Sequence, residues 1–187
     1  MIDQIVALDL RVLHAIIATR TENLLLFFKF VTLLASPVVV VLGIGAVCCG
    51  LAIRKQLKVA VVLCSGLVVT EAAMFTLKHL IRRDRPDAAL HAVVEDGFSM
   101  PSGHATSAAF FFGVLAYLLV RGPVLRKWQK VVAVLVALAA VIAVDFSRMY
   151  LGVHYLSDVI AGNVVGFLGL FATIAVIERL RNEKRVT

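Results

Sequence analysis

The chain contains little charge for its length. Only 17% of its 187 residues are Asp, Glu, Lys or Arg, whereas 61% are hydrophobic and the mean hydropathy is +0.96. A water-soluble domain carries about 25% charged residues, so this composition excludes that class and indicates an integral membrane protein. Internal repeats, low-complexity segments and long linkers are also missing. We therefore expect one membrane domain over residues 1–187.

Cysteine is scarce as well. Cys48, Cys49 and Cys64 lie inside apolar runs, without a histidine or acidic partner at the spacing of metal ligands. We interpret them as small hydrophobic residues. The sequence has neither a carboxylate cluster suited to Mg²⁺ nor a His/Cys set suited to Zn²⁺, so it predicts no metal cofactor.

The net charge is +7, from 19 Lys and Arg against 12 Asp and Glu. No basic run is interleaved with aromatic residues, so a nucleic-acid partner is not expected. The cations instead flank the apolar segments, where anionic lipid headgroups and phosphate groups are the expected counter-charges. The pattern predicts membrane lipids as partners and gives no prediction of a protein partner.

Five apolar runs approach the length of about 20 residues that crosses a bilayer. They cover 28–51, 59–80, 104–120, 128–144 and 159–176. Residues 1–22 mix apolar and charged side chains, which is typical of an amphipathic surface helix or an incomplete span, and Asp3 and Asp9 argue against a secretion signal. The predicted fold class is all-α. It is an integral membrane bundle of about five to six transmembrane helices with an N-terminal amphipathic helix, a transmembrane core over 28–176 and a basic cytoplasmic tail over 177–187.

The positions of the cations predict the orientation. Those that follow the first, third and fifth spans share one side, which the positive-inside rule makes cytoplasmic. They are Arg54, Lys55, Lys58, Arg121, Arg126, Lys127, Lys130, Arg179, Arg181, Lys184 and Arg185. Arg82, Arg83, Arg85 and Arg148 fall on the outer side, against that rule. We therefore expect these four to serve a purpose other than topology, at the extracytoplasmic side of a plasma (inner) membrane protein.

The segment KHLIRRDRP places Lys78 and Arg85 seven residues apart, followed by Pro86. If the helix of the second span continues, seven residues make about two turns and return to nearly the same face. Two cations would then point at one anion. A lysine that reaches up to the headgroups, followed by a lipid-binding loop, is the alternative interpretation.

The segment MPSGHA, at the start of the third span, combines Pro101, Ser102, Gly103 and His104. A Pro-Ser-Gly turn that opens a helix presents backbone N–H groups and a hydroxyl at the positive end of the helix dipole, which suits a phosphate. His104 is then next to the anion site. An ordinary helix N-cap beside a histidine is the alternative.

The segment SRMYLGVHYLSD contains Arg148, His154 and Asp158. On a helix, a four-residue step places Asp158 on the face of His154, so its carboxylate can hold one ring N–H and leave the other nitrogen free to attack. Arg148 offers a planar fork for two phosphate oxygens. A structural His–Asp pair is the alternative for this segment alone.

Together, the three segments resemble the signature of the type 2 phosphatidic acid phosphatase (PAP2) superfamily: KxxxxxxRP, PSGH and SRxxxxxHxxxD. Every fixed position matches, in order. The resemblance implies a metal-independent enzyme that works through a phosphohistidine and, in the membrane branch, acts on lipid phosphates or diphosphates. It implies that His154 is the nucleophile, Asp158 its orienting partner, and His104 the acid that protonates the leaving oxygen and then activates water. The implied phosphate-binding residues are Lys78, Arg85, Ser102, Gly103 and Arg148.

For the substrate, outward motifs and a small chain favour an isoprenoid diphosphate such as undecaprenyl diphosphate. Phosphatidylglycerophosphate, phosphatidic acid and a lipid A phosphate are alternatives, because the motifs recognise the phosphoryl group rather than its carrier. An alternative of another class is a non-catalytic protein that binds or transports a lipid phosphate. Such a protein is expected to lack the nucleophile or the acid, whereas His104, His154 and Asp158 are all present.

Other polar residues are weaker candidates. Glu71 lies well inside the second span, where an ionisable group is costly, so either a functional role or a hydrogen bond to a neighbouring helix is expected. Asp84 and Asp145 are candidates for orienting Arg85 and Arg148, respectively. The remaining candidates are Asn163 for a bond between helices, and His91, Glu95 and Asp96 for contact with a substrate headgroup.

Overall fold

The computed structural model describes the backbone of residues 2–186 and the side chains of residues 3–183. The helices are α1 Ile2–Ile17, α2 Glu22–Leu33, α3 Pro37–Ile53, α4 Leu57–Ile81, α5 Gly103–Arg121, α6 Lys127–Tyr150 and α7 Leu156–Val186, with a short 3₁₀ helix at Ala88–Leu90. Within this range all regular structure is helical, which confirms the all-α class. The predicted tail continues α7 as far as Val186; Met1, Thr187 and the side chains of Lys184 and Arg185 lie outside the described residues.

Four helices, α4 to α7, are long and apolar enough to cross a membrane. Helices α2 and α3 together meet the same criterion as one span that is bent by 42°. The described residues thus provide up to five spans, the lower number of the prediction. The four unbroken spans run further than predicted at both ends, because the helices continue through residues beyond each apolar run.

The predicted first span, 28–51, is broken between Leu33 and Pro37. Proline cannot donate the backbone N–H that would continue a preceding helix, so Pro37 instead starts a new one. Ser36 caps this new helix by accepting the Val39 N–H at 3.4 Å. The apolar pattern did not reveal the break because the residues on both sides of it are apolar.

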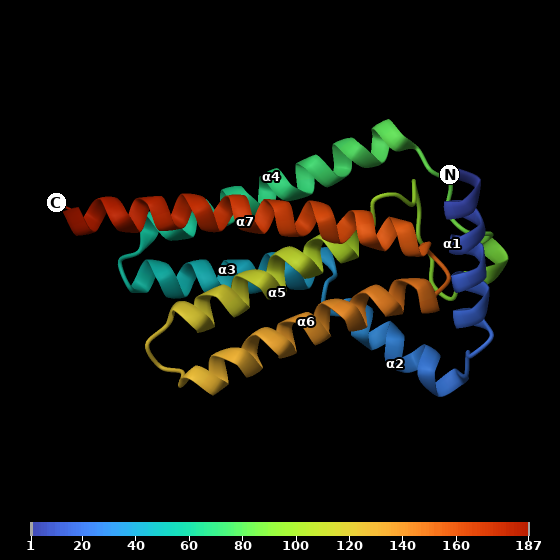
Figure 1. Ribbon diagram of the computed structural model, residues 1–187, viewed down its shortest axis with the longest axis horizontal. Helices are drawn as coiled ribbons and strands as arrows, with labels where there is room; N and C mark the ends of the chain where they lie inside the picture. Colours follow the sequence, from blue (N-terminus) through green and yellow to red (C-terminus); the bar gives the residue numbers. More distant parts are fainter. Residues whose placement is uncertain (1, 187) are drawn as a thin grey trace.

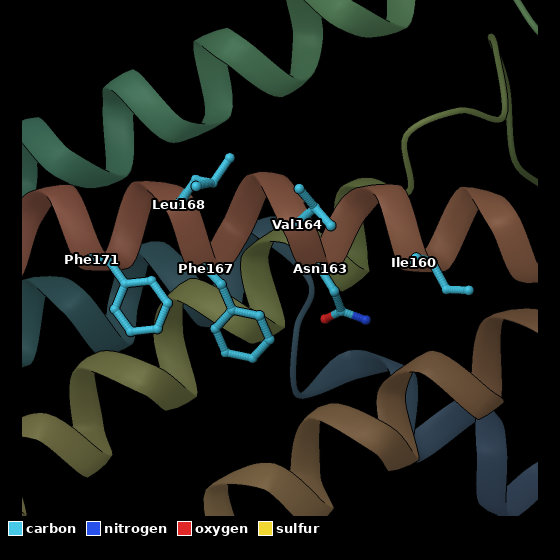
Figure 2. A pocket seen from close by; sticks show the side chains of 6 residues that line it. All are labelled: Ile160, Asn163, Val164, Phe167, Leu168 and Phe171. Carbon is cyan, nitrogen blue, oxygen red and sulfur yellow. The ribbon is translucent and has the colours of Figure 1, made fainter.

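The surface of the bundle is apolar where the helices face outward. On α7, Ile160, Val164, Leu168 and Phe171 are each more than half exposed. Together with Phe167 and Asn163 they line an open, mostly apolar pocket on this helix (Figure 2). Such a surface is expected of a helix that faces lipid, and it agrees with the predicted membrane location.

Helix α1 crosses the end of the bundle and does not run along it (Figure 1). It packs against α6 and α7. Leu13 and Asp9 on its inner face are each 1% exposed, whereas Ile5 and Leu8 are each 47% exposed. The N-terminal helix is therefore amphipathic as predicted, but its buried face includes a carboxylate.

Helix α5 lies at the centre of the bundle, packed against α3, α4, α6 and α7. Its contact with α7 is close because glycines of α7 face the backbone of α5. A Cβ atom on Gly162 would lie 2.5 Å from the Ser102 carbonyl oxygen, and one on Gly166 would lie 2.5 Å from that of Thr106. The Thr106 hydroxyl also donates to the Gly162 carbonyl at 3.0 Å. Small residues thus allow two membrane helices to approach closely and fix their register.

This packing predicts that Gly162→Ala destabilises the protein by about 1–3 kcal/mol, because the added methyl group overlaps α5. Thermal unfolding in detergent measures the effect as a lower midpoint. Gly45→Ala is the matched control, since a Cβ there has no neighbour within 4 Å. Equal midpoints for the two variants would contradict the proposed packing.

Candidate active site

The three motif segments meet at the end of the bundle that α1 covers, where α4 and α6 end and α5 and α7 begin (Figure 1). A pocket of about 240 Å³ opens there. It is lined by Ala35, Pro37, Glu71, Met74, Lys78, Arg85, Glu95, Asp96, Gly103, His104, Ser107 and His154. Five of the eight predicted site residues are among them. The other three, Ser102, Arg148 and Asp158, are buried next to residues that line the pocket.

His154 and Asp158 face each other as predicted, although His154 lies in the loop before α7 and only Asp158 is helical. Nδ1 of His154 is 3.5 Å from Oδ2 of Asp158. The same Oδ2 accepts the Tyr155 N–H at 2.9 Å. On the other side of the ring, Nε2 is 3.2 Å from Nη1 of Arg85. The imidazole is therefore held between a carboxylate and a pocket cation.

Burial lowers the pKa of His154 to about 4; Asp158 partly offsets this effect, and the charges of Arg148 and Arg85 reinforce it. The ring is consequently neutral at neutral pH, with a proton on one nitrogen and a lone pair on the other. With the proton on Nδ1, which faces the carboxylate, the lone pair lies on Nε2. This tautomer is the one that a nucleophile requires.

Lys78 and Arg85 reach the same pocket, but the predicted reason, a helix that continues from one to the other, was wrong. Helix α4 ends at Ile81, and Arg82 adopts a left-handed conformation with φ of 51°, so Arg85 lies in the following loop. Lys78 donates to the Phe98 carbonyl at 2.8 Å. The loop, rather than a second helical turn, brings the guanidinium back to the lysine. Arg85 donates at 3.0 Å to each of three carbonyl oxygens, those of Asp96, Gly97 and Val153.

Arg148 is 1% exposed and shares a carboxylate with Arg85. Its Nη2 donates to Oε1 of Glu95, and Nη2 of Arg85 is 3.5 Å from Oε2 of the same residue. Nη1 of Arg148 donates to the Thr32 hydroxyl at 2.9 Å. Although burial raises the pKa of Glu95, the charge and hydrogen bond of Arg148 lower it to below its ordinary value. An ionised carboxylate therefore bridges two of the predicted phosphate ligands.

The start of α5 provides free backbone donors. Ser102 is the N-cap, and its hydroxyl accepts the Ala105 N–H at 3.5 Å. The Ser102 N–H donates to the Asp158 carbonyl at 3.0 Å. Among the described residues, the N–H groups of Gly103 and His104 have no acceptor. The two residues line the pocket at the positive end of the helix dipole, where an anion is favoured.

The weaker candidates divide into three groups. Glu71 accepts a hydrogen bond of 2.6 Å from Ser107, and both residues line the pocket. Asn163 makes the expected bond between helices, donating to Asp145 at 2.6 Å. Asp96 lines the pocket, whereas His91 bonds the Pro86 carbonyl outside it.

The predicted partners of the two arginines need correction. Asp145 bonds Asn163 and not Arg148, and Asp84 contributes its backbone carbonyl to a hydrogen bond with Ser99. The carboxylate that contacts both arginines belongs to Glu95. Sequence proximity misled here, because Glu95 is distant from Arg148 in sequence and reaches it only through the fold.

Sequence reasoning missed a second ion-pair network at the site. Nη1 of Arg83 is 2.7 Å from Oδ1 of Asp158, and Nη2 of the same guanidinium is 2.7 Å from Oδ2 of Asp9. The available signal was the outward position of Arg83, against the positive-inside rule. Asp9 gave no signal beyond its place in an amphipathic helix.

The curated proteins to which the chain is similar include two bacterial proteins that are named as lipid phosphatases. The chain is 42% identical over 106 residues to phosphatidylglycerophosphatase B of Bacillus subtilis (strain 168), which covers 56% of this chain and 51% of that protein. It is 36% identical over 128 residues to YbjG of Escherichia coli (strain K12), named as a candidate undecaprenyl-diphosphatase, covering 64% of this chain and 57% of that one. The chain thus spans about half the length of these curated relatives.

A solved structure extends the likeness to the whole fold. The crystal structure of a transmembrane PAP2 type phosphatidylglycerolphosphate phosphatase from Bacillus subtilis matches with a TM-score of 0.85 at 29% identity. The match covers 91% of this chain and 85% of that one. The family model of the PAP2 superfamily matches residues 59–182, a range that contains all three motif segments and most of the chain. The protein belongs to the PAP2 superfamily.

Proposed function

We propose that the protein is a membrane lipid phosphatase that removes the terminal phosphate of a lipid phosphate or diphosphate. The observation that carries this proposal is the position of the His154 imidazole, which faces Asp158 on one side and lines a pocket together with Lys78, Arg85 and His104 on the other. The outward cations of the sequence support an active site at the extracytoplasmic face of the plasma membrane. Ala35 and Pro37, at the break between α2 and α3, also line the pocket. We propose that the lipid approaches from this side, where the pocket adjoins apolar spans.

The proposed reaction has two steps. In the first, Nε2 of His154 attacks phosphorus, the bond from phosphorus to the lipid oxygen breaks, and His104 gives its proton to that oxygen. In the second, water attacks the phosphohistidine while His104 takes a proton from it. The N–P bond then breaks, which releases inorganic phosphate and restores both histidines. Asp158 keeps the attacking imidazole oriented throughout.

Fixed charges and donors stabilise the phosphoryl group in this scheme. Phosphoryl transfer places charge on the equatorial oxygens, so positioned cations and N–H groups supply most of the catalysis. Lys78, Arg85 and Arg148 provide the cations, and the free N–H groups of Gly103 and His104 provide neutral donors. Among the described residues, no group of three or more His, Cys, Asp or Glu side chains could hold a metal ion. We therefore assign charge neutralisation to these cations and expect activity without a metal.

Ser102 has a different position from the other proposed phosphate ligands. It is fully buried, its hydroxyl caps α5, and its N–H is bonded to Asp158. We propose that it acts on the phosphoryl group by presenting the N-terminus of α5 to the pocket. Its second effect is to tie that N-terminus to the segment of the nucleophile.

Undecaprenyl diphosphate is the substrate that we propose first. An outward site suits a lipid carrier that is dephosphorylated outside the cytoplasm, and the Escherichia coli relative supports this choice by its name. Phosphatidylglycerophosphate is the second candidate. It is favoured by the higher identity to the Bacillus subtilis relative and by the structural match.

Phosphate release in detergent tests the proposal directly. Undecaprenyl diphosphate, phosphatidylglycerophosphate, phosphatidic acid and a lipid A phosphate are assayed in parallel with EDTA present. We expect turnover to persist in EDTA and to be fastest with undecaprenyl diphosphate. His154→Ala should lower kcat at least about 10³-fold, because the nucleophile is lost.

His79→Ala is the control variant for this assay, since His79 is exposed and lies outside the pocket. It should retain normal turnover. A wild-type protein that binds these lipids but releases no phosphate would support the non-catalytic alternative. Faster turnover of phosphatidylglycerophosphate would replace the first substrate with the second.

The Glu95 carboxylate contacts both Arg85 and Arg148, two of the residues that we propose as phosphate ligands. Two oxygens on one carbon imitate two oxygens on phosphorus in front of the same guanidinium groups. A bound phosphoryl group therefore has to displace this carboxylate or share the arginines with it. Either event weakens anion binding relative to a pocket without the carboxylate.

Glu95→Gln should consequently strengthen competitive inhibition by inorganic phosphate about 10-fold, since a charge-assisted pair contributes about 1.5–3 kcal/mol and a tenfold change needs about 1.4. The inhibition constant is measured with the preferred lipid. Asp96→Asn is the matched control: it removes a neighbouring charge, but Asp96 contacts Arg85 through its backbone carbonyl. An unchanged constant in Glu95→Gln, or an equal gain in both variants, would refute the competition.

A further inference from the structure

Arg83 lies two residues beyond the end of α4, and its side chain reaches the start of α7. Its guanidinium donates to Oδ1 of Asp158 at 2.7 Å and to the Ser157 hydroxyl at 2.6 Å. It also donates to Oδ2 of Asp9 at 2.7 Å. Arg83 is not among the residues that line the pocket. The side chains that it contacts, Asp158, Ser157 and Asp9, do not line the pocket either, so we assign this cation a role other than contact with the phosphoryl group.

The position of the Arg83 guanidinium is fixed from several sides. It lies over the ring of Tyr155, with 4.3 Å between its central carbon and the ring centroid. Its own backbone carbonyl accepts the Ser99 N–H at 2.8 Å. The side chain is 21% exposed, so its ion pairs are only partly screened by solvent. These contacts make Arg83 a fixed support rather than a mobile surface charge.

Arg83 determines which oxygen of Asp158 faces the histidine. Oδ1 is taken by the guanidinium, whereas Oδ2 accepts the Tyr155 N–H and faces Nδ1 of His154. Without Arg83, no other donor to Oδ1 remains among the described residues, and the Tyr155 N–H then gives the one hydrogen bond among them that restrains rotation of the carboxylate about its last side-chain bond. A histidine nucleophile depends on its carboxylate partner for tautomer and ring orientation, so such rotation reduces the reactive population.

Asp9 extends the network to the N-terminal helix. It is 1% exposed, and its Oδ1 accepts the Ser157 N–H at 2.9 Å while Oδ2 accepts the Ser157 hydroxyl at 2.5 Å. Asp9 therefore caps α7 from another helix and at the same time pairs with Arg83. The partly exposed Arg83 guanidinium pairs with two carboxylates, and removal of either one leaves it with a single partner.

We propose that Arg83 is a positioning residue that acts through Asp158 on His154, and that Asp9 makes helix α1 part of the same positioning chain. The role of Arg83 rests on the proposed phosphatase activity. It goes beyond that activity because the signature KxxxxxxRP leaves the position of Arg83 unspecified, and because α1 lies outside all three motif segments.

Steady-state kinetics of Arg83→Met tests the proposal with the lipid that the wild-type protein turns over fastest. We expect kcat to fall about 10–100-fold, the range for residues that orient a reacting group, while KM stays within about twofold because phosphate binding is untouched. Arg83→Lys should recover part of kcat, since one ammonium group can pair with one carboxylate but not bridge two. Arg82→Met is the matched control and should retain wild-type kcat, because Arg82 is exposed and its side chain, among the described residues, donates only to the His79 carbonyl.

A double-mutant cycle separates positioning from a merely structural role. If Arg83 acts through Asp158, Arg83→Met should have no further effect on kcat in the Asp158→Asn background. Full additivity would overturn the proposal, as would an Arg83→Met protein with wild-type kcat or with a raised KM alone. Equal losses in Arg83→Met and Arg82→Met would also overturn it.

Asp9→Asn provides the test if Arg83→Met does not fold, as judged by gel filtration and thermal unfolding. This variant keeps the size of the side chain and should lower kcat several-fold at constant KM; unchanged kcat would overturn the role of α1 and of the chain through Arg83. The proposed function is tested separately by the wild-type protein. Absence of phosphate release from the wild type refutes the phosphatase proposal, whereas an active wild type with an unaffected Asp9→Asn or Arg83→Met refutes only the positioning chain.

Discussion

The close contact between α5 and α7 is the constraint on which the site depends. Gly162 and Gly166 let the two helices approach until backbone meets backbone, and the Ser102 N–H then reaches the Asp158 carbonyl. One hydrogen bond thereby joins the PSGH segment to the HxxxD segment. The distance from His104 and the free N–H groups of α5 to His154 depends on this register, because no hydrogen bond among the described residues joins these groups to His154 directly. A shift between the helices would move the proposed acid relative to the proposed nucleophile.

Charge balance is the second constraint, since the site gathers cations at one end of an apolar bundle. The described structure balances them in two groups. Glu95 pairs with Arg85 and Arg148 at the pocket, and Asp9 and Asp158 pair with Arg83 behind the histidine. Only the first group lies where a phosphoryl group can replace the carboxylate. The second group keeps its partners during the proposed reaction and can therefore orient the nucleophile.

Local patterns predicted the helical class, a helix that opens at the PSGH segment and the pairing of His154 with Asp158, because these features depend on residues within a few positions of each other. The same reasoning failed where the chain turns back on itself. Arg82 ends α4 in a left-handed conformation, so Arg85 reaches the pocket through a loop. Glu95, rather than Asp84 or Asp145, pairs with the arginines. Neither outcome follows from spacing, since each is set by the path of the loop between α4 and α5.

The central claim is that His154 carries the phosphoryl group during turnover. Rapid acid-free quenching of the wild-type protein with its preferred lipid phosphate, followed by mass spectrometry of peptides, measures this directly. We predict a phosphate adduct on the imidazole of His154 that is stable in alkali and lost in acid, and that forms and decays at the rate of turnover. Turnover at full rate with no adduct on His154, or with the phosphate on a different residue, would contradict the proposed mechanism.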